Sequence, residues 1–163
     1  MLKRSVLLIA FDAEEKGLLG SKYFIQNPTV DKSNIVTMIN MDMIGNMQDS
    51  TLIIGGVGTS PLFEPMLDSL SKDSGLKFKF NQAGYGPSDH ASFYSENIPV
   101  LFFFTGDFES YYHLPEDDWQ TINTQGEKQI LDVIYELTIK ISRENSKPIF
   151  TLSGPKKQKA QRT

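Results

Sequence analysis

Acidic side chains and a histidine come directly after apolar runs in this sequence of 163 residues. Glu14 and Glu15 follow the first run, and Asp42 follows the second. His113 and Asp117 come shortly after the most apolar run of all. Because ligands in open α/β sheets gather beyond the carboxyl ends of the strands, we expect these groups to share one edge. Two glutamates, an aspartate and a histidine at one place favour a divalent cation, with zinc the leading candidate.

Each of these residues also has a purely structural interpretation. Glu14 and Glu15 could simply lie near a helix N-terminus, where the helix dipole favours negative charge. Asp42 could form a turn, and Asp117 could cap one. A single histidine beside tyrosines, such as His113, is often packed and hydrogen-bonded without binding anything. Taken singly, none of these residues decides between a structural role and a metal site.

The composition narrows the kinds of site that are possible. With no cysteine, disulfides, thiolate zinc sites and cysteine nucleophiles are excluded, and with only two histidines a metal site must depend on carboxylates. The net charge is -4, and four of the 16 basic residues lie in residues 155–163. The rest therefore has 12 basic against 20 acidic residues, a net charge of -8. This acidic body argues against a nucleic-acid surface, and the basic tail is either an interaction arm or a solvated end.

The apolar run at residues 6–11, preceded by Lys3 and Arg4, imitates the start of a secretory signal. It is shorter than the roughly 7–15 apolar residues that such a signal needs, so a buried parallel strand explains it better. No run approaches the roughly 18 apolar residues of a membrane span.

The rest of the chain alternates strand patterns with helix patterns. We expect strands in four ranges, of which the last should be central in the sheet: 35–40, 52–54, 76–80 and 98–104. A helix should start at Ser60 and Pro61 and stop at Gly75, and a short helix should cover residues 90–94. This order predicts an α/β fold, a three-layer sandwich with a mostly parallel or mixed central sheet.

The last predicted helix opens with a capping box at residues 124–127. Apolar residues at helical spacing predict its inner face, which consists of Ile130, Leu131, Ile134, Leu137 and Ile141.

Four motifs, in order, resemble those of the co-catalytic zinc aminopeptidases. Residues 11–21 are similar to the Glu-Glu-x-Gly-Leu-x-Gly-Ser signature, and residues 40–45 to Asn-x-Asp-Met-Ile-Gly. Residues 88–93 resemble the Ser-Asp-His motif, and residues 112–117 the Tyr-His-x-Pro-x-Asp motif. The resemblance covers residues 6 to about 142, and the animal glutaminyl cyclases are relatives of the same family.

The resemblance implies a role for each matching acid and histidine. Glu14 would be the general base that takes a proton from metal-bound water and passes it to the leaving amine. Glu15 and His113 would bind one zinc ion, and Asp42 would bind the other. The implied activity is that of a metallo-exopeptidase that removes N-terminal residues from peptides.

Further residues have implied roles around these groups. Tyr85 matches a position at which some members stabilise the oxyanion with a tyrosine hydroxyl. Asp89 and Asp117 would hold ligands or the substrate end in place, and Met43 would line the pocket for the substrate side chain. His90 is expected to be structural.

The resemblance also implies that this chain carries only part of the site. The family has two more ligands upstream, a histidine and an aspartate that bridges two zinc ions. Residues 1–146 are therefore expected to be the C-terminal part of a zinc-peptidase-like domain, incomplete at its N-terminal side. Residues 147–163 would be an extension, disordered from about residue 154. We expect one zinc ion or none in this chain, and little or no peptidase activity.

Partners and alternatives follow from the same resemblance. A peptide is the expected substrate, and self-association or a missing N-terminal segment would cover uncovered parts of the sheet. Nucleic acid and a membrane span are not expected, and family members of this kind are often exported. One alternative is a glutaminyl cyclase-like acyltransferase with the same glutamate as proton shuttle. The other is a non-catalytic homologue that uses the fold for binding.

Overall fold

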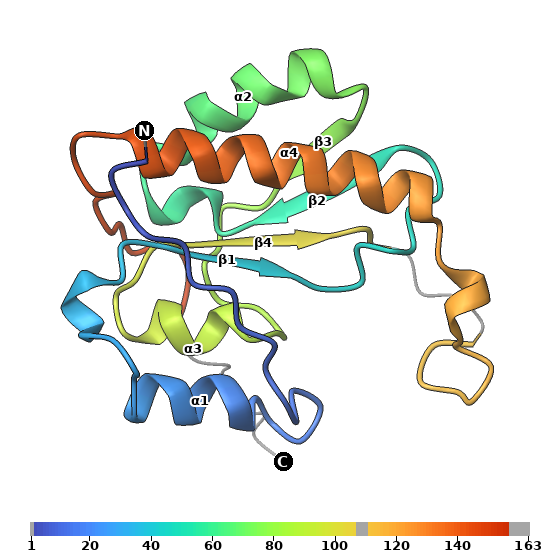
Figure 1. Ribbon diagram of the computed structural model, residues 1–163, viewed down its shortest axis with the longest axis horizontal. Coiled ribbons are helices and arrows are strands. Elements are labelled where there is room, and N and C mark those ends of the chain that lie inside the picture. The colour runs from blue at the N-terminus through green and yellow to red at the C-terminus, as the bar shows by residue number, and fades with distance from the viewer. Residues whose placement is uncertain (1, 107–110, 157–163) are drawn as a thin grey trace.

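The structure is a computed structural model that describes residues 2–106 and 111–156. A sheet forms the middle layer, with α2 and α4 on one face and α1 and α3 on the other (Figure 1). The helices are α1 (Leu19–Gln26), α2 (Phe63–Ser74), α3 (His90–Ser95) and α4 (Thr124–Arg143). Three short 3-10 helices complete the described part, namely η1 (Lys32–Asn34), η2 (Val57–Thr59) and η3 (Trp119–Thr121). The predicted three-layer α/β sandwich is confirmed.

The sheet is mixed and has the strand order β1-β4-β2-β3. Its strands are β1 (Met38–Met41), β2 (Thr51–Gly55), β3 (Lys77–Phe80) and β4 (Val100–Phe104). β1 is parallel to β4 and β2 is parallel to β3, whereas β2 and β4 are antiparallel. β4 is central, as its apolar sequence predicts, because a strand covered on both faces has no room for polar side chains.

The larger core lies between the sheet and the α2–α4 layer. Helical spacing of three and four residues turns one face of each helix toward the strands. The fully buried members of this core are Leu52, Ile54, Phe63, Leu67, Leu101, Phe103, Ile130 and Leu137. Burial of each such side chain contributes about 1.5–3 kcal/mol relative to exposure, so this layer fixes the sheet on which the site is built.

The N-terminus of α4 differs from the prediction by one residue. Asn123, not Thr124, caps the helix, because the Asn123 side chain accepts a hydrogen bond from the Gly126 backbone N–H at 2.9 Å. The predicted capping box is therefore wrong. Leu131, predicted on the inner face, is 41% exposed, and Val133 is buried instead because it lies on the stripe formed by its neighbours three and four positions away.

The observed start of α2 differs from the predicted start, whereas its end is as predicted. The helix begins at Phe63, and Ser60 lies in the preceding turn, where its Oγ accepts from the Leu62 N–H at 3.4 Å. Gly75 ends the helix with a φ of 70°, a conformation that costs glycine little.

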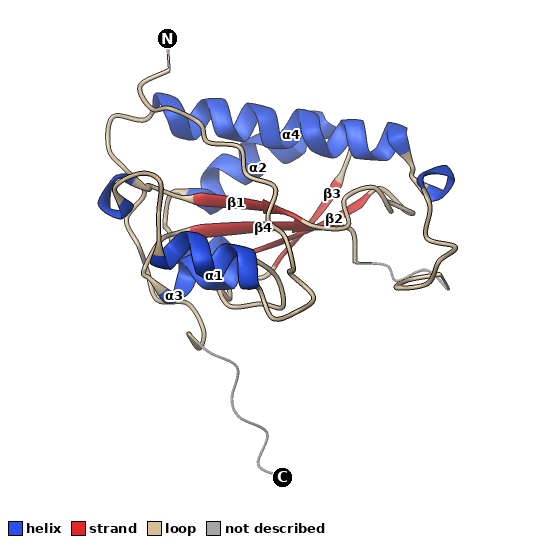
Figure 2. Cartoon of the chain, turned by 60° about the horizontal axis from the view of Figure 1, so that its bottom comes forward, coloured by secondary structure: helices blue, strands red, loops and turns tan. Residues whose placement is uncertain are grey.

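Residues 6–11 do not form the buried parallel strand that their apolar run predicts. Val6, Leu7, Leu8 and Ile9 are exposed, and β1 stays the edge of the sheet in the described chain. Both ends of this segment are tied to other elements, since it runs from the end of α4 to the start of α1 past β1 (Figures 1 and 2). An apolar run indicates that a strand is possible, but pairing needs a neighbour in register.

The chain after α4 returns to the domain. The Thr151 N–H donates to the Thr59 carbonyl, and the Tyr94 hydroxyl donates to the Ser153 carbonyl at 2.7 Å. Residues 157–163 lie outside the described residues, so their expected disorder stays a prediction. None of the helices in the described ranges has the length and apolar character needed to cross a membrane.

Candidate active site

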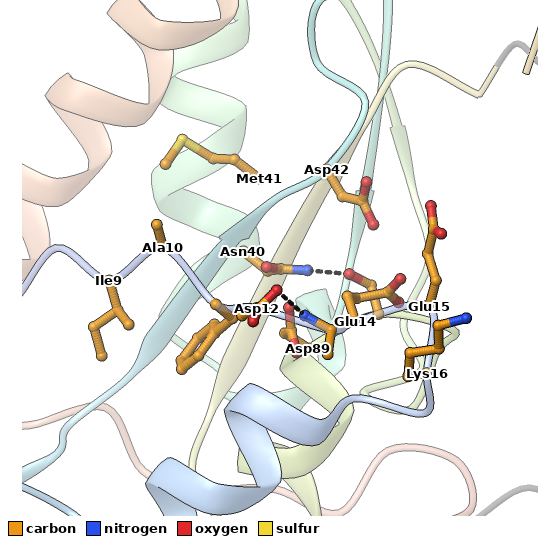
Figure 3. Close-up of a pocket in the computed structure, with 13 residues that line it drawn as sticks. Ile9, Ala10, Asp12, Glu14, Glu15, Lys16, Asn40, Met41, Asp42 and Asp89 are labelled. Atoms are coloured by element: carbon orange, nitrogen blue, oxygen red, sulfur yellow. Dashed lines mark hydrogen bonds between the residues drawn. The ribbon is translucent and has the colours of Figure 1, made fainter. Parts of the chain in front are cut away.

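An acidic cavity of about 680 Å³ lies between residues 9–16 and the carboxyl end of β1 (Figure 3). Its polar lining comes from three places in the sequence: the turn before α1, the end of β1 and the loop before α3. The acidic residues of the lining are Asp12, Glu14, Glu15, Asp42 and Asp89. The topology therefore brings together four carboxylates from the two motifs at residues 11–21 and 40–45, with a fifth from residues 88–93.

A tight turn presents the two adjacent glutamates. The Leu18 N–H donates to the Glu14 carbonyl at 2.7 Å, and the Gly20 N–H donates to the Asp12 carbonyl at 3.1 Å. A Cβ on Gly20 would lie 2.6 Å from that Asp12 carbonyl oxygen, so the close approach requires glycine. Glu14 and Glu15 leave this turn in different directions, which lets neighbours in sequence serve different purposes (Figure 3).

Backbone strain concentrates at this site. Six non-glycine residues of the described chain have a positive φ, and three of them adjoin or belong to the candidate groups. Ala13 precedes Glu14, Met43 follows Asp42, and the third is His113 itself. The left-handed conformation costs a residue with a side chain roughly 1–2 kcal/mol. Strain that the surrounding structure holds in place is typical of functional sites.

The side chains of Glu15 and His113 meet across two loops. The Nε2 atom of His113 lies 3.1 Å from Oε1 of Glu15, although nearly a hundred residues separate them in sequence. Both side chains are exposed, at 54% for His113 and 67% for Glu15, and the Tyr112 ring stacks on the imidazole at a centroid distance of 3.8 Å. Solvent screening makes such a contact worth little for stability.

The Glu14 carboxyl lies in an environment that disfavours its charge. Partial burial raises its pKa above the ordinary value, and the charges of Asp42, Asp89 and Glu15 raise it further, while His113 acts in the opposite direction. A carboxylate with a raised pKa holds a proton more readily, which is a property of general bases that work near neutral pH.

Asp89 lies at the base of the cavity and is buried. Burial raises the pKa of its carboxyl, a hydrogen bond from Ser21 lowers it, and the charge of Asp42 raises it again. Its Oδ1 atom is buried and has no hydrogen-bond partner in the described chain. A buried carboxylate oxygen without a donor is costly to the fold.

Asn40 is a buried polar residue of the site for which sequence analysis predicts no role. Its Nδ2 donates to Ser88 Oγ at 2.7 Å and lies 3.4 Å from Nδ1 of His90. It thereby joins the end of β1 to the loop that carries Asp89. The sequence contains a feature that could have identified Asn40, because Asn40 is the first residue of the motif that contains Asp42.

Other predicted site residues lie outside this cavity. Met43 and Asp117 line a second cavity of about 330 Å³, which they share with Tyr111 and Tyr112. The Tyr85 ring packs against the apolar cluster around Phe93 on the α1–α3 side, and its predicted role at the oxyanion stays a prediction.

The donor types fit zinc, but their number is small. Carboxylate and imidazole are both ordinary zinc ligands, and Glu15 and His113 already lie at contact distance from each other. Within residues 2–106 and 111–156, no three His, Asp or Glu side chains converge closely enough to hold a metal ion. Three or four protein ligands are usual for zinc, so two donors bind it weakly.

Comparison with known proteins identifies similar peptidases. The model of peptidase family M28 matches residues 1–138. Aminopeptidase YwaD of Bacillus subtilis (strain 168) is 27% identical over an alignment that covers 89% of this chain and 34% of that protein. Leupeptin-inactivating enzyme 1 of Streptomyces exfoliatus is 35% identical over 95 residues, 58% of this chain and 21% of that protein.

Solved structures show the same fold. The zinc aminopeptidase BSAP from Bacillus subtilis superimposes with a TM-score of 0.66 at 25% identity, over 88% of this chain and 38% of that one. The chain therefore spans little more than a third of the length of these aminopeptidases.

Proposed function

Because the chain belongs to peptidase family M28, we propose that it supplies the general base and part of the metal ligands of a zinc aminopeptidase. The substrate class is a peptide with a free N-terminus. The observation that supports this most directly is the placement of Glu14, with its raised pKa, beside Asp42 and the Glu15–His113 pair. The two adjacent glutamates, Asp42 and His113 come from three separate parts of the chain, and a merely structural role for each would not require these parts to meet.

In this proposal Glu14 moves the proton. Its carboxylate takes a proton from the attacking water and returns it to the nitrogen of the leaving amine. Partial burial, followed by the charges of Asp42 and Asp89, raises the Glu14 pKa, which favours the protonated carboxyl between these two transfers. The cavity of about 680 Å³ has room for the scissile peptide beside this carboxylate.

The remaining groups would hold metal. Glu15 and His113 would bind one zinc ion and Asp42 a second, with Asp89 behind them as an acceptor for an oriented ligand or the substrate amine. Zinc, when bound, would polarise the scissile carbonyl and lower the pKa of water.

The small number of donors limits what the chain does alone. Because fewer than three donors converge in the described residues, further ligands must come from elsewhere before zinc is held tightly. We therefore expect weak zinc binding, and aminopeptidase turnover at least about 10³-fold below that of an intact family member.

Zinc titration tests the proposed ligands. In calorimetry of the apo chain, zinc binding should be weak and should be lost in Glu15→Gln and His113→Ala, whereas Glu64→Gln on the exposed face of α2 should not alter it. Zinc binding that survives both ligand substitutions would contradict the assignment.

A chimera tests the catalytic role. Residues 6–146 of this chain would replace the matching region of Bacillus subtilis aminopeptidase YwaD, with zinc content measured before assay. We expect hydrolysis of an amino-acid nitroanilide, and a loss of at least about 10³-fold in kcat for Glu14→Gln at unchanged zinc content. A folded, zinc-loaded chimera that instead cyclises an N-terminal glutamine peptide, or does neither reaction, would refute the peptidase assignment.

A further inference from the structure

Asp42 and Met43 are neighbours in sequence, but they line different cavities. Asp42 lines the acidic cavity of about 680 Å³, and Met43 lines the second cavity of about 330 Å³. The Asp42 carboxylate points toward Glu14 and Glu15 (Figure 3). The direction of each side chain depends on the backbone torsions of these two residues, so whatever holds this backbone decides what each cavity contains.

The backbone of Met43 is left-handed, with a φ of 53°. This conformation is unfavourable for a residue with a side chain, and apart from glycine it is adopted most readily by asparagine and aspartate. The methionine side chain offers no local hydrogen bond that would favour it. Contacts from elsewhere in the fold must therefore hold Met43 in this conformation.

Thr105, the first residue after β4, makes such a contact. It is 2% exposed, and its Oγ1 donates a hydrogen bond to the Met43 carbonyl at 2.7 Å. The Asp42 N–H donates to the Phe103 carbonyl at 3.1 Å. These two bonds lie on either side of the Asp42–Met43 peptide, and both connect it to the end of β4. Because β4 is paired on both of its edges, it gives this turn a firm support.

The Thr105 bond differs from an ordinary threonine bond within a helix. In α4 the Thr138 Oγ1 donates to the Ile134 carbonyl at 2.7 Å, and the helix already determines the backbone of both residues. The Thr105 bond has the same length, but it joins residues 62 positions apart and ends on a left-handed residue. Loss of the Thr105 hydroxyl would leave the Met43 carbonyl without this donor and would let Met43 return to a favourable conformation.

We propose that Thr105 is a positioning residue of the site. Its hydroxyl holds Met43 in the left-handed conformation, and this conformation directs Asp42 into the acidic cavity and Met43 into the second cavity. All the contacts that support this role lie within residues 42–105. The conformational role stands on these contacts alone, whereas its value for zinc binding by Asp42 rests on the proposed function.

Solution NMR of the full chain in the presence of a chelator tests the conformational role. At positive φ the amide proton and the Hα of one residue lie close together, so their NOE is strong. The Met43 NOE should be strong in wild type and in Thr105→Ser, which keeps the hydroxyl. It should be lost in Thr105→Val, which keeps the shape of the side chain and removes the hydroxyl. A strong Met43 NOE that persists in folded Thr105→Val would overturn the proposal.

A second substitution tests the cause. In the double variant Met43→Asn with Thr105→Val, asparagine tolerates the left-handed backbone without the hydroxyl, so the strong NOE at residue 43 should return. Thr138→Val is the matched control, because it removes a hydrogen bond of the same length and should leave the Met43 NOE unchanged. Loss of the NOE in Thr138→Val, or its absence in the double variant, would contradict the proposed role.

Cooperative urea unfolding shows which variants are folded. If Thr105→Val does not fold, folding of the double variant supports the proposal, because relief at residue 43 then compensates for the missing hydroxyl. If neither folds, Thr105 is needed for the core as a whole and the proposal fails.

Zinc separates this proposal from the proposed function. Zinc should shift the carboxyl-carbon resonance of Asp42 in wild type, and the shift should be smaller in Thr105→Val. An Asp42 resonance that zinc does not move in wild type would contradict the zinc role of Asp42. The positioning role would still stand, provided that the Met43 NOE responds to the Thr105 hydroxyl as described.

Discussion

The two histidines of this chain lie in regions that treat the same side chain in opposite ways. His90, at the start of α3, is 2% exposed, and its ring stacks on Phe102 with centroids 4.4 Å apart. His113 lies in the loop after β4, with a φ of 61°, and meets Glu15 in solvent. Burial lowers the pKa of His90 to about 4, so it is neutral at pH 7.

The contrast separates a residue that holds the site together from one that is available to bind. His90 stacks on an aromatic ring, has the Asn40 amide beside its Nδ1 and is shielded from water. Its imidazole is therefore not accessible to a ligand from solvent. His113 has an exposed nitrogen next to a carboxylate, on a backbone conformation that costs energy. Local environment, rather than residue type, therefore distinguishes a structural histidine from a candidate ligand.

The largest expected difference between them is in stability. His90→Ala should lower the free energy of unfolding by about 3–4 kcal/mol, because it leaves a cavity beneath Phe102. His113→Ala should change it by no more than about 0.5 kcal/mol, since its partner is exposed. Urea unfolding of both variants measures the two values. Equal losses of unfolding free energy in the two variants would contradict the assignment of His90 as structural and His113 as a candidate ligand.

The pH dependence of stability should include a contribution from His90. Its folded pKa of about 4 lies below the unfolded value of 6.5, so the unfolded chain takes up the proton first. Stability from this residue is therefore complete above pH 6.5 and falls by up to about 3 kcal/mol as the pH drops toward 4.

His90→Phe provides the comparison, because it keeps a ring against Phe102 and removes the titrating group. Urea unfolding at a series of pH values should give a difference between wild type and His90→Phe that shifts through this window. A difference that does not change with pH would show that the pKa of His90 is not lowered in the fold.

Zinc binding should depend on His113 and not on His90, which is the reverse of their effects on stability. His113→Ala should weaken the zinc-induced rise in Tm by an amount that corresponds to at least a tenfold loss of affinity, about 1.4 kcal/mol. His90→Phe should retain the rise, because its ring faces Phe102 and Asn40 rather than the cavity. Thermal unfolding with and without zinc measures both. Loss of the zinc effect in His90→Phe alone would reverse the assignment.

The smallest effect concerns the crowded carboxylates next to His113. Because the folded pKa of Glu14 is raised, its charge destabilises the metal-free fold above that pKa. Glu14→Gln should therefore stabilise the chain by a few tenths of a kcal/mol at pH 7 in the presence of a chelator, after allowance for solvent screening. The gain should vanish as the pH falls below the unfolded pKa. Glu64→Gln on α2 serves as the control, and a loss of stability in Glu14→Gln would contradict the electrostatic account.

Elements with strong local signals were predictable from the sequence. Residues 98–104 are apolar throughout and become the central strand β4, and Gly75 ends α2 as expected. Errors arose where two neighbouring residues offered similar signals. Asn123 and Thr124 both suit a helix cap, and only the backbone path decided that Asn123 bonds to Gly126.

The strand predicted at residues 6–11 shows a different limit. Apolar composition reports what a segment can bury, but a strand exists only when another backbone lies in register beside it. In the structure β1 and this segment stay unpaired with each other, and the acidic cavity lies between residues 9–16 and the end of β1.

The sequence by itself determined the chemistry available to this protein: carboxylates and two imidazoles, no thiols, and two adjacent glutamates followed by glycines. Only the tertiary structure decided which of them meet. Glu15, in the turn before α1, and His113, in the loop after β4, come to 3.1 Å although they are far apart in the sequence. The orphaned oxygen of Asp89 and the positive φ of His113 likewise depend on packing between distant segments, which no local pattern encodes.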